Sequence, residues 1–145
     1  ILAHTEDGVE LLEEAKLPSV IVDICREHHG TSLLRYFYVK ATEQGEVNEA
    51  DFRYSGPKPQ TREAAVIMIV DSIEAAVRSM KSPTEAGIQE LDKKIIREKL
   101  LDDQFSDCEM TTRDIYRVGE SACHTLSGLF HERIEYPELK KEELK

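Results

Sequence analysis

Two adjacent histidines, His28 and His29, are the first residues of this sequence whose type and spacing could do chemistry. They fall near the end of an expected helix, directly before Gly30. Neighbours on a helix point about 100° apart, so the two imidazoles would reach different points and could serve two ligands or two metal ions. One core or capping histidine beside one solvent-facing histidine would explain the same pair.

A single carboxylate, Asp71, interrupts a strongly apolar segment that we expect to form a buried helix. A buried carboxylate without a partner is costly. Either an arginine, such as Arg35 or Arg78, or a metal ion should therefore meet it. Imidazole nitrogen together with carboxylate oxygen suits Mn, Fe or Zn. The third candidate is His4, which lies four residues before Gly8, where the missing side chain permits a close approach. Alone, His4 could equally be a surface or core histidine.

Other polar and aromatic groups are weaker candidates. His124 and His131 share roughly one face of the last expected helix, and we interpret both as surface residues. Residues 52–60 combine cations, an aromatic ring, an amide and two prolines, which could hold a phosphate and stack a base or could form a rigid connector. The aromatic residues 36–38 could likewise pack in the fold or provide a stacking platform.

Helical periodicity, which must position these residues, runs through nearly the whole chain, and no alternating strand pattern stands out. We expect helices over residues 1–15, 18–30, 32–44, 61–80, 85–103 and 112–133, with a short helical turn at 49–52 inside a break over residues 45–60. Thr31 and Thr61 are expected N-caps, and Thr111 with Asp114 should begin the last helix. The prediction is one all-α domain over residues 1–135, followed by a charged tail over 136–145.

Composition bounds the class of protein. The 145 residues are 40% hydrophobic, 33% charged and only 6% aromatic, which fits one polar helical domain. The net charge of −10 makes a nucleic acid polymer a poor partner, whereas a small phosphorylated ligand could still bind beside metal cations. Three widely spaced cysteines do not form a disulfide framework and fit a reducing compartment. No apolar run is long enough to span a membrane, and we expect no membrane contact from this segment itself.

The chain opens with Ile1-Leu2-Ala3-His4, without an initiator methionine or a polar lead-in. These residues read as the middle of a helix. We interpret the sequence as a piece of a longer protein.

Four stretches carry a resemblance to a known family. They are residues 28–31, 36–38, 53–60 and 71–78, which read His-His-Gly-Thr, Tyr-Phe-Tyr, Arg-Tyr-Ser-Gly-Pro-Lys-Pro-Gln and Asp-Ser-Ile-Glu-Ala-Ala-Val-Arg. In order and wording they resemble the HD domain of the bacterial seven-transmembrane HD phosphodiesterases, over residues 1–135. The resemblance implies an HD-type helical bundle with a two-metal site, usually Mn or Fe, that hydrolyses cyclic di-AMP to linear pApA. It also implies a cytoplasmic domain of a bacterial plasma-membrane protein.

The resemblance further implies which residues act. By motif position the metal ligands are His4, His28, His29 and Asp71. The candidate contacts with the substrate are Tyr54, Lys58, Gln60 and Arg78. The first histidine and the His-Asp dyad of the family have no counterpart here, because no His-Asp dipeptide occurs in the chain. We expect both, with the helices that carry them, upstream of Ile1.

Two other functions stay open. One is a different HD-type phosphohydrolase, acting on a mononucleotide or an alarmone. The other is a non-catalytic module, in which the truncated domain binds a nucleotide or only packs against its neighbours. A histidine and a His-Asp dyad upstream of this sequence would decide between enzyme and module.

Overall fold

The computed structural model describes residues 1–129, and these residues form helices and connecting loops. In chain order the elements are α1 (His4–Glu14), α2 (Ser19–Glu27), α3 (Arg35–Thr42), the 3-10 helix η1 (Glu49–Phe52), α4 (Arg62–Arg78), α5 (Glu85–Leu101) and α6 (Thr112–Leu129). Residues 1–129 contain no strand, and their only bridge pairs Leu33 with Arg53. The prediction of an all-α chain is confirmed.

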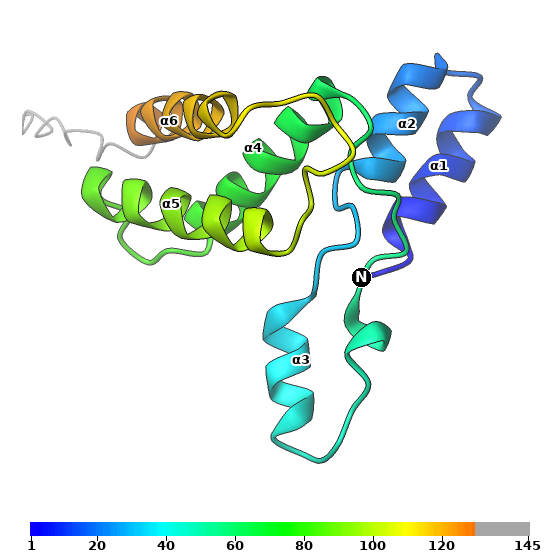
Figure 1. The fold of residues 1–145 in the computed structure, drawn as a ribbon, viewed down its shortest axis with the longest axis horizontal. Coiled ribbons are helices and arrows are strands. Elements are labelled where there is room, and N and C mark those ends of the chain that lie inside the picture. The colour runs from blue at the N-terminus through cyan, green and yellow to red at the C-terminus, as the bar shows by residue number, and fades with distance from the viewer. Residues whose placement is uncertain (130–145) are drawn as a thin grey trace, which may run out of the picture.

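The helices form two packed groups and a projecting arm (Figure 1). Helices α4, α5 and α6 pack on one another, and α1 packs on α2. The two groups meet where α2 contacts α4. Helix α3 contacts η1, and this pair extends away from both groups as an arm. Helix α2 therefore joins the two groups, because it contacts α1 on one side and α4 on the other.

The hydrophobic core lies between α4, α5 and α6. Met68, Ile69 and Ile73 of α4 are fully buried there, together with Ile88 and Ile96 of α5. Ile88 and Ile96 are eight residues apart, so they lie on one face of α5. The expectation that α4 is buried on most sides is only partly correct. Ile67 and Val70 remain 42% and 38% exposed, because the neighbouring helices cover the opposite side of α4.

Two predicted helix starts are confirmed by their caps. Thr61 Oγ1 accepts a hydrogen bond from the backbone N–H of Ala64 at 3.2 Å. At the start of α6, Thr111 Oγ1 accepts from the N–H of Asp114 at 3.1 Å, and Asp114 Oδ2 accepts from the N–H of Thr111 at 3.1 Å. Such reciprocal bonds satisfy backbone donors that the helix itself leaves free.

The predicted N-cap at Thr31 is wrong. Helix α3 begins at Arg35, and Thr31 bonds Gln104 in the α5–α6 loop instead. The Thr31 N–H donates to Gln104 Oε1 at 3.0 Å, and Thr31 Oγ1 accepts from Gln104 Nε2 at 2.9 Å. A tertiary partner has replaced the local cap.

Within residues 1–129, no helix has the length and apolar character needed to cross a membrane. Cys25, Cys108 and Cys123 are free thiols, as their spacing predicted. His131 and the predicted tail over residues 136–145 lie outside the described residues.

Candidate metal centre

Three histidines from different elements meet at the junction of the two helical groups. His4 is the first residue of α1, His28 caps the C-terminus of α2, and His29 follows in the loop. Their ligand nitrogens all lie within 4.8 Å of one another. The ring centroids are 5.5 Å apart for His4 and His28, 4.9 Å for His4 and His29, and 4.1 Å for the adjacent pair. The structure therefore brings together three of the four residues expected to bind metal.

Two glycines make this convergence possible. A Cβ atom at Gly8 would lie 2.8 Å from Cys25 Sγ, so α1 approaches α2 closely only because Gly8 has no side chain. Gly30 has a φ of +53°, a left-handed conformation that glycine adopts readily, and it turns the chain away after the histidine pair. The close approach expected at Gly8 and the stop expected at Gly30 are both present.

Backbone carbonyls orient two of the imidazoles. His28 Nδ1 lies 2.7 Å from the carbonyl oxygen of Cys25, and His4 Nδ1 lies 2.5 Å from that of Ile1. A carbonyl oxygen only accepts, so each Nδ1 is the donor; in the tautomer that this selects, the lone pair is on Nε2. Metal-binding histidines are commonly held in this way by a hydrogen bond from their other ring nitrogen.

His29 is half-buried against an aromatic ring. Tyr54 stacks on it, with centroids 4.4 Å apart and an interplanar angle of 20°. Burial, followed by the charges of His28, His4 and Lys99, lowers the pKa of His29 to about 3. His29 is therefore neutral near pH 7, which is the form that binds a metal ion. Three imidazoles this close together fit a divalent transition metal.

Asp71 lies beside this cluster rather than inside it. Its carboxylate is not among the ligand atoms gathered within 4.8 Å. Its charge nevertheless raises the pKa of Tyr54, after the larger effect of burial, and also acts on Lys99. The expectation that Asp71 is buried is wrong, because it is half-exposed on α4. Its role as a metal ligand stays a prediction.

The arginines named as alternative partners for Asp71 bind other carboxylates. Arg35 Nη1 lies 2.6 Å from Glu98 Oε1, and Arg78 pairs with Glu74 one turn back on α4. In the described part of the chain Asp71 forms no ion pair at all. This leaves its carboxylate available to a cation.

The four expected substrate contacts lie in three places. Tyr54 belongs to the histidine cluster, also meeting His4 edge-on with centroids 5.7 Å apart. Lys58 and Gln60 instead reach the α5–α6 loop, where Lys58 Nζ lies 3.2 Å from Asp103 Oδ2 and Gln60 Nε2 lies 3.3 Å from Asp107 Oδ2. Arg78 is exposed on α4. His124 is exposed on α6, as predicted.

Sequence reasoning missed three residues around the centre. Glu27 is buried, and its Oε2 accepts from the backbone N–H of Gln60 at 2.9 Å, which ties α2 to the start of α4. Gln104 is buried and binds Thr31. Lys99 lies close enough to His29 and Asp71 for its charge to act on both. None had a local signal, because their partners are distant in sequence and Lys99 belongs to a helix rich in exposed cations.

Comparison with known families agrees with this geometry. The model of the HD domain family matches residues 1–76, a stretch that contains all three histidines and Asp71. This chain belongs to the HD domain family. Such membership implies a dependence on divalent metal ions, and the three-histidine cluster of this HD domain fits one.

Curated relatives of this HD domain include two bacterial enzymes. The chain is 51% identical over 142 residues to the cyclic-di-AMP phosphodiesterase PgpH of Bacillus subtilis strain 168. It is 52% identical over 141 residues to the PgpH of Listeria monocytogenes strain 10403S. Both matches cover 97% of this chain but only 20% of the relative. The chain thus spans a fifth of the length of these relatives.

Solved structures share the fold. The crystal structure of the L. monocytogenes PgpH HD domain matches 90% of this chain and 61% of that chain, with a TM-score of 0.84 and 52% identity. The structure of that HD domain in complex with cyclic-di-AMP matches 93% of this chain and 64% of that chain, with a TM-score of 0.86 and 51% identity.

Proposed function

We propose that this HD domain hydrolyses cyclic di-AMP to linear pApA at a two-metal site that takes Mn or Fe. One observation carries the proposal: His4, His28 and His29 come from separate elements, yet their ligand nitrogens lie within 4.8 Å of one another. The likeness to phosphodiesterases named for this substrate supports it. The same likeness supports a place on the cytoplasmic side of a bacterial membrane protein.

Each residue near the centre has a proposed task. His4 and His28 present Nε2 because their Nδ1 atoms are bound to carbonyl oxygens. His29 offers a neutral imidazole, and Asp71 would complete the ligand set from α4. Divalent cations bound there would supply Lewis acidity toward a phosphodiester and an attacking water. Tyr54, stacked on His29, closes one side of the centre and is placed to touch the substrate.

Lys58, Gln60 and Arg78 are further proposed contacts with the substrate. Lys58 and Gln60 would have to release Asp103 and Asp107 before they could bind it. The double variant Lys58→Ala, Gln60→Ala decides this point. If the pair binds substrate, the Kd for cyclic di-AMP should rise roughly tenfold, about 1.4 kcal/mol. An unchanged Kd would show that residues 53–60 are a connector.

The test uses the full-length protein, stripped of metal by a chelator and reloaded with Mn. Conversion of cyclic di-AMP to pApA is followed by chromatography, and metal content is measured in parallel. Asp71→Ala should abolish turnover while circular dichroism shows intact helices. The control is Glu63→Ala, which removes an exposed carboxylate from the first turn of the same helix.

Retained turnover in Asp71→Ala would remove that residue from the ligand set. If the reloaded wild-type protein cleaved a mononucleotide or an alarmone and left cyclic di-AMP intact, the proposed substrate would be wrong. Failure to bind any divalent metal would refute the centre itself.

A further inference from the structure

His29 is the one clustered histidine whose ring makes no hydrogen bond within residues 1–129. Backbone carbonyls orient His4 and His28, whereas His29 is held by its stack on Tyr54 and by the backbone that carries it. The position of the His29 imidazole therefore depends on two chain segments, the one that contains it and the one that contains Tyr54.

The backbone that follows His29 is held at Thr31, whose three polar groups all bind residues far along the chain. Its N–H donates to Gln104 Oε1 at 3.0 Å, and its Oγ1 accepts from Gln104 Nε2 at 2.9 Å. Its carbonyl oxygen accepts from Arg53 Nη1 at 2.9 Å. Helix α2 ends at Glu27, so regular helical hydrogen bonds do not extend to Thr31 and these distant partners determine where it lies.

Gln104 is a buried side-chain amide, only 1% exposed, in the α5–α6 loop. Its orientation is fixed by chemistry, because the Thr31 N–H can only donate and must therefore face Oε1. Its Nε2 also donates to the carbonyl oxygen of Asp102 at 3.2 Å and to Asp102 Oδ2 at 3.0 Å. Gln104 Oε1 packs against Gly30, where a Cβ atom would overlap it. One side chain thus holds both residues that follow His29.

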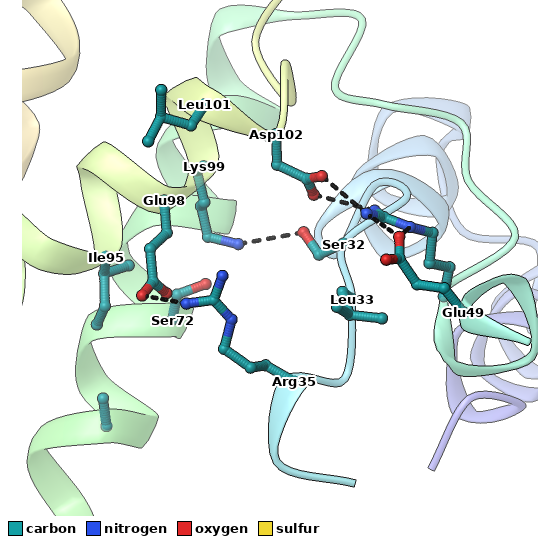
Figure 2. Close-up of a pocket in the computed structure, with 12 residues that line it drawn as sticks. Ser32, Leu33, Arg35, Glu49, Ser72, Ile95, Glu98, Lys99, Leu101 and Asp102 are labelled. Carbon is teal, nitrogen blue, oxygen red and sulfur yellow. Dashed lines mark hydrogen bonds and ion pairs between the residues drawn. The ribbon is translucent and has the colours of Figure 1, made fainter. Parts of the chain in front are cut away.

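The same hydrogen bonds reach the segment that carries Tyr54. The Asp102 carboxylate accepts two hydrogen bonds from the Arg53 guanidinium, at 3.0 and 3.1 Å (Figure 2). The next residue, Tyr54, donates its backbone N–H to the carbonyl oxygen of Ser32 at 3.2 Å. Through Asp102, Gln104 therefore ties together the two segments that carry the stacked rings.

We propose that Gln104 is a positioning residue of the candidate metal centre. Through Thr31 it fixes the His29 imidazole relative to the other two histidines. This rests on the proposed function, because it requires that the histidines bind a divalent metal ion. Gln104 acts through the backbone and needs no contact with metal or substrate. Ligands must be held to within about 0.5 Å of their productive geometry, and partners that orient them typically change metal affinity by about 10–100-fold.

Metal affinity tests this role separately from turnover. The full-length protein is stripped of metal with a chelator and titrated with Mn in a calorimeter. Gln104→Met keeps the length of the side chain but removes its hydrogen bonds, so the apparent Kd for Mn should rise roughly tenfold or more. Gln89→Met is the matched control, because Gln89 is an exposed glutamine on α5, and its Kd should equal that of wild type.

A second pair of variants changes the same contact from the side of Thr31. Thr31→Val keeps the shape of the side chain but removes the oxygen that accepts from Gln104 Nε2. It should also weaken Mn binding, by a smaller factor, because the Thr31 N–H still has its acceptor. Thr31→Ser retains the hydroxyl oxygen and should bind Mn as wild type does. These two variants decide the point even if Gln104→Met folds poorly.

Cobalt distinguishes positioning from a merely structural role. The visible absorption bands of bound Co²⁺ report the geometry of its ligands. At saturating Co²⁺, Gln104→Met should change these bands because His29 is displaced. Ile88→Val is the control for stability, since it removes a methyl group from the buried core of the same protein. It should lower the melting temperature and leave both the bands and the Kd for Mn unchanged.

The outcomes separate this role from the function on which it rests. A wild-type Kd for Mn and a wild-type cobalt spectrum in both Gln104→Met and Thr31→Val would overturn the positioning role while the metal centre stands. Equal losses of Mn affinity in Thr31→Val and Thr31→Ser would also overturn it, because the hydroxyl would then not matter. A wild-type protein that bound no divalent metal would overturn the proposed function, and this role with it.

Discussion

Replacing Gly30 with alanine should destabilise the protein where the histidine pair is held. Gly30 follows His29 directly and has a φ of +53°. A Cβ atom built there would lie 2.4 Å from Gln104 Oε1 and 2.8 Å from Met68 Cε. Gln104 Oε1 accepts the backbone hydrogen bond of Thr31, so pushing it away also loosens the chain after the histidines.

The expected loss can be estimated from these contacts. A left-handed conformation costs an L-residue other than glycine roughly 1–2 kcal/mol. Forcing a methyl group into a packed site adds about 1–3 kcal/mol. The lower entropy of the unfolded alanine chain opposes both by about 0.4–1 kcal/mol. We expect Gly30→Ala to lower the free energy of unfolding by roughly 3 kcal/mol, a large share of the ~5–15 kcal/mol that holds a typical domain together.

Urea unfolding followed by circular dichroism measures this loss. Gly128→Ala is the matched control, because Gly128 lies on α6 with open space around its Cβ position, and it should gain up to about 1 kcal/mol. Gly30→Asn separates the two causes, since asparagine tolerates the left-handed region but carries the same Cβ. Equal losses in Gly30→Ala and Gly30→Asn would assign the effect to crowding. A Gly30→Ala protein within about 0.5 kcal/mol of wild type would refute the reasoning.

Three further predictions concern stability. Glu27→Ala should lower the free energy of unfolding by about 2 kcal/mol, because it removes the buried carboxyl oxygen that accepts a hydrogen bond from the Gln60 N–H. A urea midpoint equal to that of wild type would contradict this. Burial raises the pKa of Asp92 above 3.8, so ionisation of this carboxyl costs the native state free energy as the pH rises from about 4 to 7. Asn cannot ionise, so Asp92→Asn should become more stable relative to wild type over this pH range. Thermal melts that show no such trend would contradict this. Gly119→Ala should lose about 1–3 kcal/mol, since its Cβ would lie 2.2 Å from Asp92 Oδ1, and Gly128→Ala on the same helix is the control.

The features that were predicted best from the sequence are those formed by residues close together in the chain. The helical turn expected at residues 49–52 is η1, because short-range backbone hydrogen bonds such as that from the Asp51 N–H to the Asn48 carbonyl define it. The cap at Thr61 is likewise made within one turn of its own helix. For the candidate site, the order of the motifs predicted His4, His28 and His29 as metal ligands, and this role stays a prediction. Packing of α1 on α2 then brings them together.

Failures occurred where a partner lies far along the chain. Thr31 has the residue type of a cap, but Gln104, 73 positions away, offers it both a donor and an acceptor. Lys99 resembles the exposed lysines around it until the fold places Ser32, 67 positions away, against its ammonium group. No local pattern encodes either pairing. Polar contacts between residues far apart in the chain therefore cannot be predicted from local patterns in one sequence.

The charge of the chain and the charge of its candidate site are nearly independent. A net charge of −10 opposes an anionic ligand at long range, but physiological salt screens exposed charges beyond about 8 Å. Near the site the balance differs, because the histidine cluster can hold divalent cations and the positive charge of Lys99 acts on His29. A polymer of nucleic acid would extend beyond this region along a protein of net charge −10, whereas a small dinucleotide would not. The net charge therefore disfavours a polymer of nucleic acid but does not argue against the cyclic dinucleotide of the proposed function.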